Sequence, residues 1–553
     1  MLTGALGHVS GPGLGRTGLA ATSASIGLTF AVAVAGPSVM EPGLPGRPGQ
    51  PPWSLGLAIS PYLAVALTAA ALAAGAAGLG MCLYAARRGW TVPPWALLAA
   101  GVSAAALLAL VQPFGSSDHL SYAAYGRMVV TGHDPYTTTP WELARAGDPV
   151  ARAVQDWKNS PSVYGPLATG LQALASLAGG DSARLTVFVV SLINAAAFAG
   201  TGLLLHWLAR GSRQRQLRAG LLWTLNPLLL QVLVAGAHVD SQALFFAVAA
   251  VCLFAVALRS AGRCPAAPIR FAAAAGAGAT AGLAAAVKVS FVLLAVGLGA
   301  AALLAWWPRT TPEDRARWRV PGLWIALGGL AAGLVVAGTV GLIPWGIRPL
   351  STALHAGSYV SIGSPWRAVR SALRLAIRSE SAADNAVKVG ALLLAAVVAV
   401  LFARPLADLA RQVRRGQMGS AVEPVSPAVL AGACVFVAGF AWLVAWPYVL
   451  PWYDALAWAP LAILPWLPQP WASLDGLLLT RTAALAFGYL PARGITMPAG
   501  LGWLESVVRT GVTPAVLLGV TVVLVVKLWP TRPWRRVPAP WHGQALRAGT
   551  MKP

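Results

Sequence analysis

The chain alternates between long apolar runs and short polar loops. Most runs hold about 20 residues with few or no charges, enough for an α-helix to cross ~30 Å of hydrocarbon. The runs predict spans at 19–36, 57–86, 95–112, 183–209, 219–235, 240–258, 271–287, 289–307, 321–344, 385–403, 426–446, 452–467, 476–490 and 511–529. The first run also has features of a secretory signal, but a second run follows closely and favours a retained span. The pattern predicts an all-α polytopic membrane protein, a bundle of about 13–14 transmembrane helices.

Basic residues gather in alternate loops, which predicts the orientation of the bundle. The basic stretches are "AARRGW", "RGSRQRQLR", "RSAGRCPAAPIR", "RTTPEDRARWR", "RQVRRG" and the tail "TRPWRR". The positive-inside rule places all of them, and both termini, in the cytoplasm. The same parity places the loop 113–182 outside. Within that loop, 164–180 is apolar but short and glycine-rich, so we expect a helix on the outer membrane face rather than a span.

Spans and loops together divide the chain into six parts. These are N-terminal transmembrane helices (1–112), a structured outer loop with interfacial helices (113–182), central transmembrane helices (183–344), an outer loop with a basic amphipathic helix (345–384), C-terminal transmembrane helices (385–529) and a cytoplasmic tail (530–553). A loop as long as 113–182 inside a compact protein is usually functional.

Composition supports the membrane class and narrows the chemistry. Hydrophobic residues make up 57% of the chain and charged residues only 10%, against about 25% charged in soluble domains. The net charge of +23 is explained by cytoplasmic loops, so we expect no nucleic acid partner. The four cysteines are far apart and suggest neither a disulfide framework nor a metal site. Nucleotide and redox motifs are absent, so energy for any synthesis must come from an activated substrate. A membrane-embedded site that faces outward fits a lipid-linked donor.

Polar residues cluster where the outer loop begins, in "FGSSDHLSYAAYGRMVVTGHDPYTTTP". A helix starting there puts Asp118, Tyr122 and Tyr125 on one face, at i, i+4 and i+7. A carboxylate at a partly dry interface has a raised pKa and can act as a general base. The alternative is that Asp118 caps this helix, because "SSD" before an apolar run is good N-cap chemistry. Asp134 is expected to hold a turn at "GHDPY", and Asp148 is expected on the solvated surface.

A second polar cluster ends "LNPLLLQVLVAGAHVDSQAL", where Asn226-Pro227 interrupts a helix. By parity, His238 and Asp240 face the same side as Asp118, and ionisable residues at such depth are usually functional. The alternative is an N-cap by Asp240 on the next helix. Lys288 breaks a long apolar run at an outer turn, where it either extends to the interface or holds an anionic group.

Two further outer segments admit two interpretations each. In "WPYVLPWYDALAWAP", the aromatic residues are most simply an interfacial belt, with sugar platforms as the alternative; a belt leaves Asp454 unexplained. The segment "SPWRAVRSALRLAIRSE" predicts an amphipathic helix lying on the outer surface. Its arginines either adhere to anionic headgroups or bind a phosphate bidentately.

Several motifs, in this order, resemble one known family: "DHLSYAAYGRMVVTGHDPYTTTP", "SVYGPL", "LNPLLLQVLVAGAHVD", "AAAVKVS" and "PWYDALAWAPL". The chain resembles the actinobacterial polyprenol-phosphomannose-dependent α-1,6-mannosyltransferases, which belong to the GT-C class of integral membrane glycosyltransferases. The motifs span about 118–460, most of the chain. Two positions depart from the family pattern. Val239 stands where the family's "AHND" has an asparagine, and this change removes a hydrogen bond to the sugar. Tyr125 replaces the glutamine of "YAAQG".

The resemblance implies a GT-C-like bundle and an inverting transfer of mannose from polyprenyl-phosphate-mannose to a mannan or glycolipid hydroxyl outside the cell membrane. It implies that Asp118 is the catalytic base. The residues that we expect to bind substrate are Tyr122, Tyr125, Asp134, Tyr164, His238, Asp240, Lys288, Arg367, Arg370 and Arg374. We expect no cofactor, and no ligand cluster demands a metal site; a divalent metal ion stays open as an alternative. The alternative function is a transporter or flippase of a lipid-linked sugar, against which no internal repeat is evident.

Overall fold

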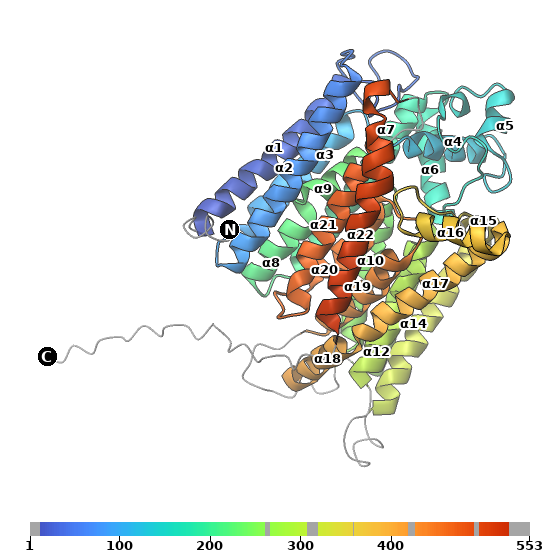
Figure 1. Ribbon diagram of the computed structural model, residues 1–553. Coiled ribbons are helices and arrows are strands. Elements are labelled where there is room, and N and C mark those ends of the chain that lie inside the picture. The colour runs from blue at the N-terminus through green and yellow to red at the C-terminus, as the bar shows by residue number, and fades with distance from the viewer. Residues whose placement is uncertain are drawn as a thin grey trace.

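The structure is a computed structural model that describes residues 11–259, 266–306, 319–357, 359–417, 426–491 and 497–529. Every regular element in these residues is helical, which confirms the all-α prediction. Figure 1 shows the helices gathered into one bundle. The expected tail 530–553, Cys264 and the loop that contains "RTTPEDRARWR" lie mostly or entirely outside the described residues.

In the part of the chain that the structure describes, eleven stretches are long and apolar enough to cross a membrane. Nine are built on one regular helix each: α1 (Gly11–Ala35), α2 (Pro61–Arg87), α7 (Ala183–Leu208), α10 (Asp240–Ala257), α11 (Ala267–Val287), α12 (Val292–Trp306) with the preceding turn η5 (Val289–Phe291), α14 (Arg319–Leu342), α17 (Glu380–Leu401) and α19 (Pro427–Ala445). The other two are composite, Arg213–Ala235 and Ala499–Leu528; the second contains η8 (Ala499–Leu501), η9 (Leu504–Val512) and α22 (Thr513–Leu528).

The three remaining predicted spans form helices that are shorter than a standard span. They are α3 (Pro94–Leu110), α20 (Ala455–Ile463) and α21 (Leu474–Gly488). The predicted span 452–467 is shortened because the four-residue turn η6 (Pro451–Asp454) precedes α20 and Pro465 follows it. Each apolar run therefore forms a helix, but these three have fewer than the ~20 residues that a perpendicular crossing needs.

The interruption predicted at Asn226-Pro227 is confirmed. The stretch Arg213–Ala235 consists of α8 (Arg213–Ala219), η2 (Gly220–Thr224), α9 (Pro227–Leu229) and η3 (Leu230–Ala235). The Asn226 side chain accepts hydrogen bonds from the backbone N–H groups of Leu228 and Leu229, so a new helix begins at the proline. The turn after η3 is held from α7, where the amide of Asn194 donates to the Ala237 carbonyl at 2.6 Å. This turn carries His238 to the start of α10.

The predicted outer loop, residues 113–182, folds into a small layer of helices. It contains α4 (Asp118–Val130), α5 (Pro140–Arg145), η1 (Ala151–Ala153) and α6 (Pro166–Gly179). A Cβ at Gly126 would lie 2.1 Å from the Gln172 carbonyl oxygen, so α4 and α6 cross at a distance that only glycine allows. Arg127 joins the layer together through ion pairs with Asp148, at 2.7 Å, and Asp181. The surface prediction for Asp148 was wrong, because this ion pair buries its carboxylate.

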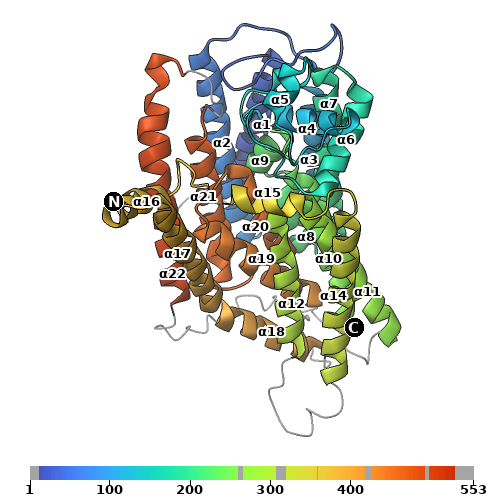
Figure 2. The same ribbon diagram turned by 90° about the vertical axis from the view of Figure 1, so that its right-hand side faces the viewer.

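Figures 1 and 2 show how the remaining amphipathic helices are placed. In both views α4, α5 and α6 lie at one end of the bundle and α18 (Ala403–Gln417) at the other. Two short helices, α15 (Arg348–Ala356) and α16 (Trp366–Ile377), lie at the ends of α14 and α17 that are nearer to α4. The predicted basic helix is thus present as α16, although Arg378 lies beyond its end in a left-handed conformation.

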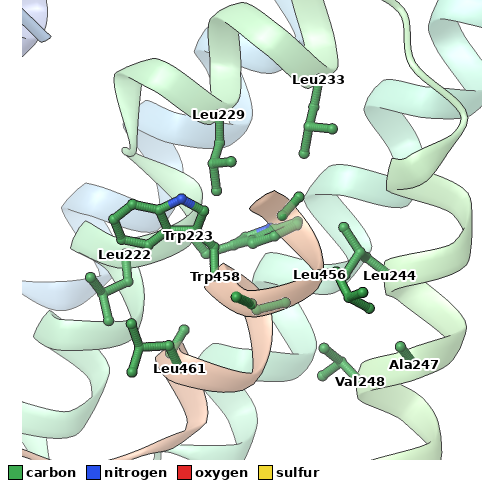
Figure 3. Close-up of a cluster of buried hydrophobic side chains, with 14 of the residues drawn as sticks. Leu222, Trp223, Leu229, Leu233, Leu244, Ala247, Val248, Leu456, Trp458 and Leu461 are labelled. Atoms are coloured by element: carbon green, nitrogen blue, oxygen red, sulfur yellow. The ribbon is translucent and has the colours of Figure 1, made fainter. Parts of the chain in front are cut away.

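The centre of the bundle is packed with large side chains from η2, η3, α10 and α20. Figure 3 shows Trp223 and Trp458 there, with leucines such as Leu233 and Leu244 around them. Each indole N–H has an acceptor: Trp223 donates to the Phe198 carbonyl at 3.0 Å and Trp458 to the Thr482 hydroxyl at 2.9 Å. Buried indoles need such partners, so these two hydrogen bonds also fix the orientation of both rings. It anchors α20, and α20 in turn positions η6 beside the site described next.

Candidate active site

A cavity of about 510 Å³ lies between the outer loop, α15 and η6. That size is typical of small-molecule sites. Its walls combine ionisable and aromatic groups: Asp118 from α4, Tyr125, Trp157 and Tyr164 from the outer loop, Lys288 from the α11–η5 turn, and Trp452 and Tyr453 from η6. Segments more than 300 residues apart in the chain therefore meet around one space.

Asp118 lies at the first position of α4, with its carboxylate towards the cavity. Ser117 is the N-cap residue and makes no side-chain capping bond, so the capping interpretation of Asp118 was wrong. One carboxylate oxygen lies 3.7 Å from Nδ1 of His238, and the Trp157 side chain donates a hydrogen bond to this carboxylate. Burial raises the pKa of Asp118 to about 7; Lys288 opposes the rise, and Asp156 adds to it. A carboxylate with this pKa is a competent proton acceptor near neutral pH.

His238 is held by contacts to one face and one edge of its ring. The imidazole is buried and stacks on Trp452, with ring centroids 3.7 Å apart and an interplanar angle of 17°. Its Nδ1 lies 3.4 Å from the Tyr122 hydroxyl, which in turn accepts a hydrogen bond from Tyr164 at 3.4 Å. Asp118 therefore adjoins a hydrogen-bonded row of side chains, and the two clusters, which were predicted to face the same side, lie together.

Lys288 and Asp240 form an ion pair at the edge of the cavity. The ammonium nitrogen lies 2.8 and 3.0 Å from the two carboxylate oxygens and 3.7 Å from the centre of the Tyr453 ring. Asp240 is the first residue of α10 and Val239 is its N-cap, so the capping interpretation was wrong here too. Lys288 lines the cavity, whereas Asp240 does not line it and holds the Lys288 ammonium in place. The pair places a fixed positive group close to the Asp118 carboxylate.

The "SVYGPL" motif positions both Tyr164 and Lys288. The N–H of Gly165 donates to the Val287 carbonyl at 2.9 Å, one residue before Lys288. A Cβ at Gly165 would lie 2.2 Å from the Ala286 carbonyl oxygen, so a larger residue would force the two segments apart. Tyr125, from the motif before it, donates its hydroxyl to the Ser160 carbonyl at 3.0 Å. These contacts join the outer loop to the end of α11.

Seven of the residues expected to bind substrate do not line the cavity. Tyr122, His238 and Asp240 lie behind its wall, where they contact lining residues, and the other four lie elsewhere. Asp134 accepts the N–H of Tyr136 at 2.8 Å and pairs with Arg348, so it holds the predicted turn. Arg367 is exposed on α16. Arg370 makes two contacts with Asp384, at 2.6 and 2.7 Å, and Arg374 lies 3.2 Å from Glu380. The residues that line the cavity include none of these four.

The aromatic residues of "WPYVLPWYDALAWAP" contribute more to the site than the sequence indicated. The belt interpretation was wrong for Trp452, which is only 3% exposed and lines the cavity beside His238. Asp454, which a belt left unexplained, is fully buried and lies 3.0 Å from Nε of Arg481 on α21. This ion pair fixes η6, and with it the two cavity rings that precede Asp454. The charged residue within the aromatic stretch was the one signal of this arrangement.

The described residues contain no group of three or more histidine, cysteine, aspartate or glutamate side chains placed to hold a metal ion. Within the same part of the chain, Cys82, Cys252 and Cys434 are free thiols. The ionisable groups that line the cavity are one carboxylate (Asp118), one ammonium (Lys288) and one imidazole (His355), beside several phenol and indole groups.

Fold and cavity together define a multi-pass membrane protein with a cavity of about 510 Å³ in which acidic, basic and aromatic groups converge. Residues 24–305 match the family model described as alpha-(1→6)-mannopyranosyltransferase, N-terminal domain. The chain belongs to this family, which confirms the resemblance that the motifs indicated.

Two curated proteins of Corynebacterium glutamicum are similar to parts of the chain. Alpha-(1→6)-mannopyranosyltransferase B is 33% identical over 138 residues, which is 25% of this chain and 23% of that protein. Alpha-(1→6)-mannopyranosyltransferase A is 26% identical over 134 residues, 24% of this chain and 27% of that protein. The alignments thus span about a quarter of each relative. No solved structure matches the chain.

Proposed function

We propose that this protein is an inverting mannosyltransferase of the cell membrane. It moves mannose from polyprenyl-phosphate-mannose to a hydroxyl of a mannan or glycolipid and forms an α-1,6 linkage. Family membership and the names of the two relatives support mannosyl transfer. The single observation that carries the mechanism is the partly buried Asp118 carboxylate, held on the cavity wall with Lys288 nearby.

Asp118 acts as the general base in this proposal. The acceptor oxygen attacks the anomeric carbon of mannose while its proton passes to the Asp118 carboxylate. The bond between that carbon and the phosphate oxygen breaks, and the polyprenyl phosphate leaves with the electron pair. A single displacement inverts the anomeric configuration. Because the pKa of Asp118 is raised to about 7, the carboxylate is basic enough to take the proton and still largely ionised just above neutral pH.

Lys288 stabilises the departing phosphate. Negative charge develops on the phosphate as the bond breaks, and a preorganised cation in a water-poor site lowers the barrier at that moment. Asp240 keeps the ammonium in place through two contacts, at 2.8 and 3.0 Å. An ammonium group has three donors, so this arrangement leaves donor capacity for a phosphate oxygen. The leaving group is already a stable anion and needs charge stabilisation rather than protonation.

The proposal places the cavity on the outer face of the membrane. The basic loops support this orientation, since Arg213 and Arg215 lie in the first turn of α8 and the basic helix α18 lies at the end of the bundle opposite α4. The interfacial helices α6, α15 and α16 then lie on the outer side, where a lipid-linked donor and a cell-envelope glycan can both reach the cavity.

Proteoliposomes that contain the purified protein test the proposal directly. They are supplied with polyprenyl-phosphate-mannose labelled in the sugar and with a soluble α-1,6-mannoside. We expect the label to appear in a longer mannoside, and only when the acceptor lies on the side that α4 faces. A transporter would instead carry the intact labelled donor across the bilayer and leave the mannoside unlabelled, which would overturn the proposal.

A further inference from the structure

Four aromatic rings form a continuous wall along the cavity. The centroids of Trp157 and Tyr359 are 5.9 Å apart, those of Tyr359 and Tyr448 6.1 Å, and those of Tyr448 and Tyr453 6.0 Å. All four residues line the same cavity. Consecutive rings are inclined by 41°, 55° and 61°, so they meet at their edges rather than covering each other's faces. The faces of Trp157, Tyr359 and Tyr448 are therefore not covered by a neighbouring ring of the wall, whereas Lys288 lies over the face of Tyr453.

The two ends of this wall adjoin the two charged groups of the site. Trp157 donates a hydrogen bond to the Asp118 carboxylate, and Tyr453 lies under the ammonium of Lys288. Exposure differs along the wall: Trp157 and Tyr359 are 42% and 40% exposed, while Tyr453 is half-buried. The Trp157–Tyr359 end is thus next to the base and open to water, and the Tyr453 end is next to the cation and enclosed.

The backbone of Trp157 is strained in order to present this ring. Its φ angle is +61°, in the left-handed region that bulky L residues rarely adopt. Such strained conformations are concentrated at functional sites. The Ser160 N–H donates to the Trp157 carbonyl at 3.0 Å and closes the turn that holds the conformation. A glycine would occupy this position without strain, whereas tryptophan reaches the cavity from a strained backbone.

We propose that Trp157 and Tyr359 form a platform that binds two successive sugar residues of an oligomannoside acceptor. This inference rests on the proposed function and adds to it the length of acceptor that the enzyme recognises. The sugar that carries the reacting hydroxyl lies on Trp157, beside Asp118, and the next sugar of the chain lies on Tyr359 towards the water. The preferred acceptor is accordingly a glycan of at least two mannose residues rather than a single sugar.

The chemistry of the platform suits a sugar better than a polyprenyl chain. A pyranose has an apolar C–H face and a rim of hydroxyl groups. Tyrosine and tryptophan match it, because each combines an apolar ring with a hydrogen-bonding group. Asn159, Ser351 and Thr352 line the same cavity and offer amide and hydroxyl groups to the sugar rim. An isoprenoid chain is a hydrocarbon and makes no hydrogen bonds to such groups.

A second groove has the apolar lining that an isoprenoid chain would need. This groove, between α2, α21, η9 and α22, is lined almost wholly by aliphatic and phenyl groups: Ala76, Leu479, Ala483, Phe487, Val508 and Val512. It contains no tyrosine or tryptophan. The contrast assigns the Trp157–Tyr359 end of the cavity to the glycan.

The experiment uses the variants Tyr359→Ala and Trp157→Gly, with Trp141→Ala as the matched control. Trp141 is a half-exposed tryptophan of the same outer loop that does not line the cavity. Steady-state transfer from polyprenyl-phosphate-mannose is measured to methyl α-mannoside and to α-1,6-mannotriose. We expect Tyr359→Ala to raise KM for mannotriose about 3- to 10-fold, a loss typical of one aromatic contact. KM for methyl α-mannoside and for the donor should be unchanged, and Trp141→Ala should match the wild type.

Equilibrium binding of labelled mannotriose to the purified protein separates this inference from the proposed function. Weaker binding by both cavity variants and normal binding by Trp141→Ala would support the platform even if no transfer occurred. A rise in KM for the donor instead of the acceptor would assign the wall to the polyprenyl chain and overturn the inference. Unchanged mannotriose binding would overturn it as well. Because glycine accepts the backbone angle of Trp157 without strain, a loss in Trp157→Gly is not explained by unfolding.

Discussion

Replacing Asp118 with asparagine tests the proposed base with little change of shape. Asparagine is nearly isosteric with aspartate, and its amide oxygen can still accept the hydrogen bond from Trp157. Asp118 makes no capping bond to α4, so no helix cap is lost. Its carboxylate is only 13% exposed, and a neutral amide is easier to bury than a charge. We therefore expect normal protein levels and an unchanged melting temperature.

The expected loss of activity follows from the role of the carboxylate. General-base catalysis contributes about 10²–10⁴-fold to rate, which corresponds to about 2.7–5.4 kcal/mol of transition-state stabilisation. Asp118→Asn should reduce kcat by that factor, with donor KM changed little because the phosphate contact lies at Lys288. Labelled mannose transfer in proteoliposomes measures both constants.

The pH dependence of the wild-type enzyme provides a second readout. The base must be deprotonated, and the pKa of Asp118 is raised to about 7 by burial. In the wild type kcat/KM should therefore increase tenfold per pH unit below about pH 7 and level off above it. An unperturbed aspartate would place this limb near pH 4. The residual activity of Asp118→Asn should lack the limb.

A matched control comes from the same outer loop. Asp134→Asn makes the same chemical change at a residue that holds a turn and does not line the cavity. We expect it to retain activity within about threefold, as for most surface changes. Turnover by Asp118→Asn close to that of the wild type would refute the base assignment. Loss of folded protein in this variant would show that Asp118 is structural instead.

Three further predictions concern charge and topology. Lys288→Gln should lower kcat by about 10²-fold, because the departing phosphate loses its cation. It should also reduce the melting temperature, because it leaves the buried Asp240 carboxylate unpaired. Adding Asp240→Asn should restore the melting temperature but not kcat. Arg370→Gln should change the rate less than about threefold at saturating and limiting donor, since its ion pair is peripheral; a large loss at limiting donor would restore a phosphate role to α16. Cysteines introduced at Asn159 and Asp181, on either side of α6, should be labelled by an impermeant reagent from the same, outer side.

The sequence was sufficient for the features that depend on local pattern. Span positions followed from the length of apolar runs, and α4 began at Asp118 as predicted. The broken helix at Asn226 followed from one asparagine–proline pair, and α16 from the three- and four-residue spacing of its arginines. These features are set by neighbours within one or two helical turns.

Other features depended on contacts between distant segments. The ion pair of Lys288 and Asp240 joins residues 48 positions apart, and no local pattern distinguishes it from a lysine that extends to the interface. Asp148 is buried through Arg127, although it lies in a polar stretch of sequence. The aromatic residues around Trp452 illustrate the same limit, because a membrane belt and the wall of a cavity have the same composition.

Analysis of the reaction product by nuclear magnetic resonance tests the central claim most directly. The purified protein is incubated with β-linked polyprenyl-phosphate-[¹³C]mannose and α-1,6-mannotriose, and the labelled product is isolated. An inverting α-1,6-mannosyltransferase must give one additional mannose whose anomeric carbon has the α configuration and is joined to O6 of the acceptor. A labelled mannose in the β configuration, a linkage to another oxygen, or recovery of unreacted mannotriose would contradict the account.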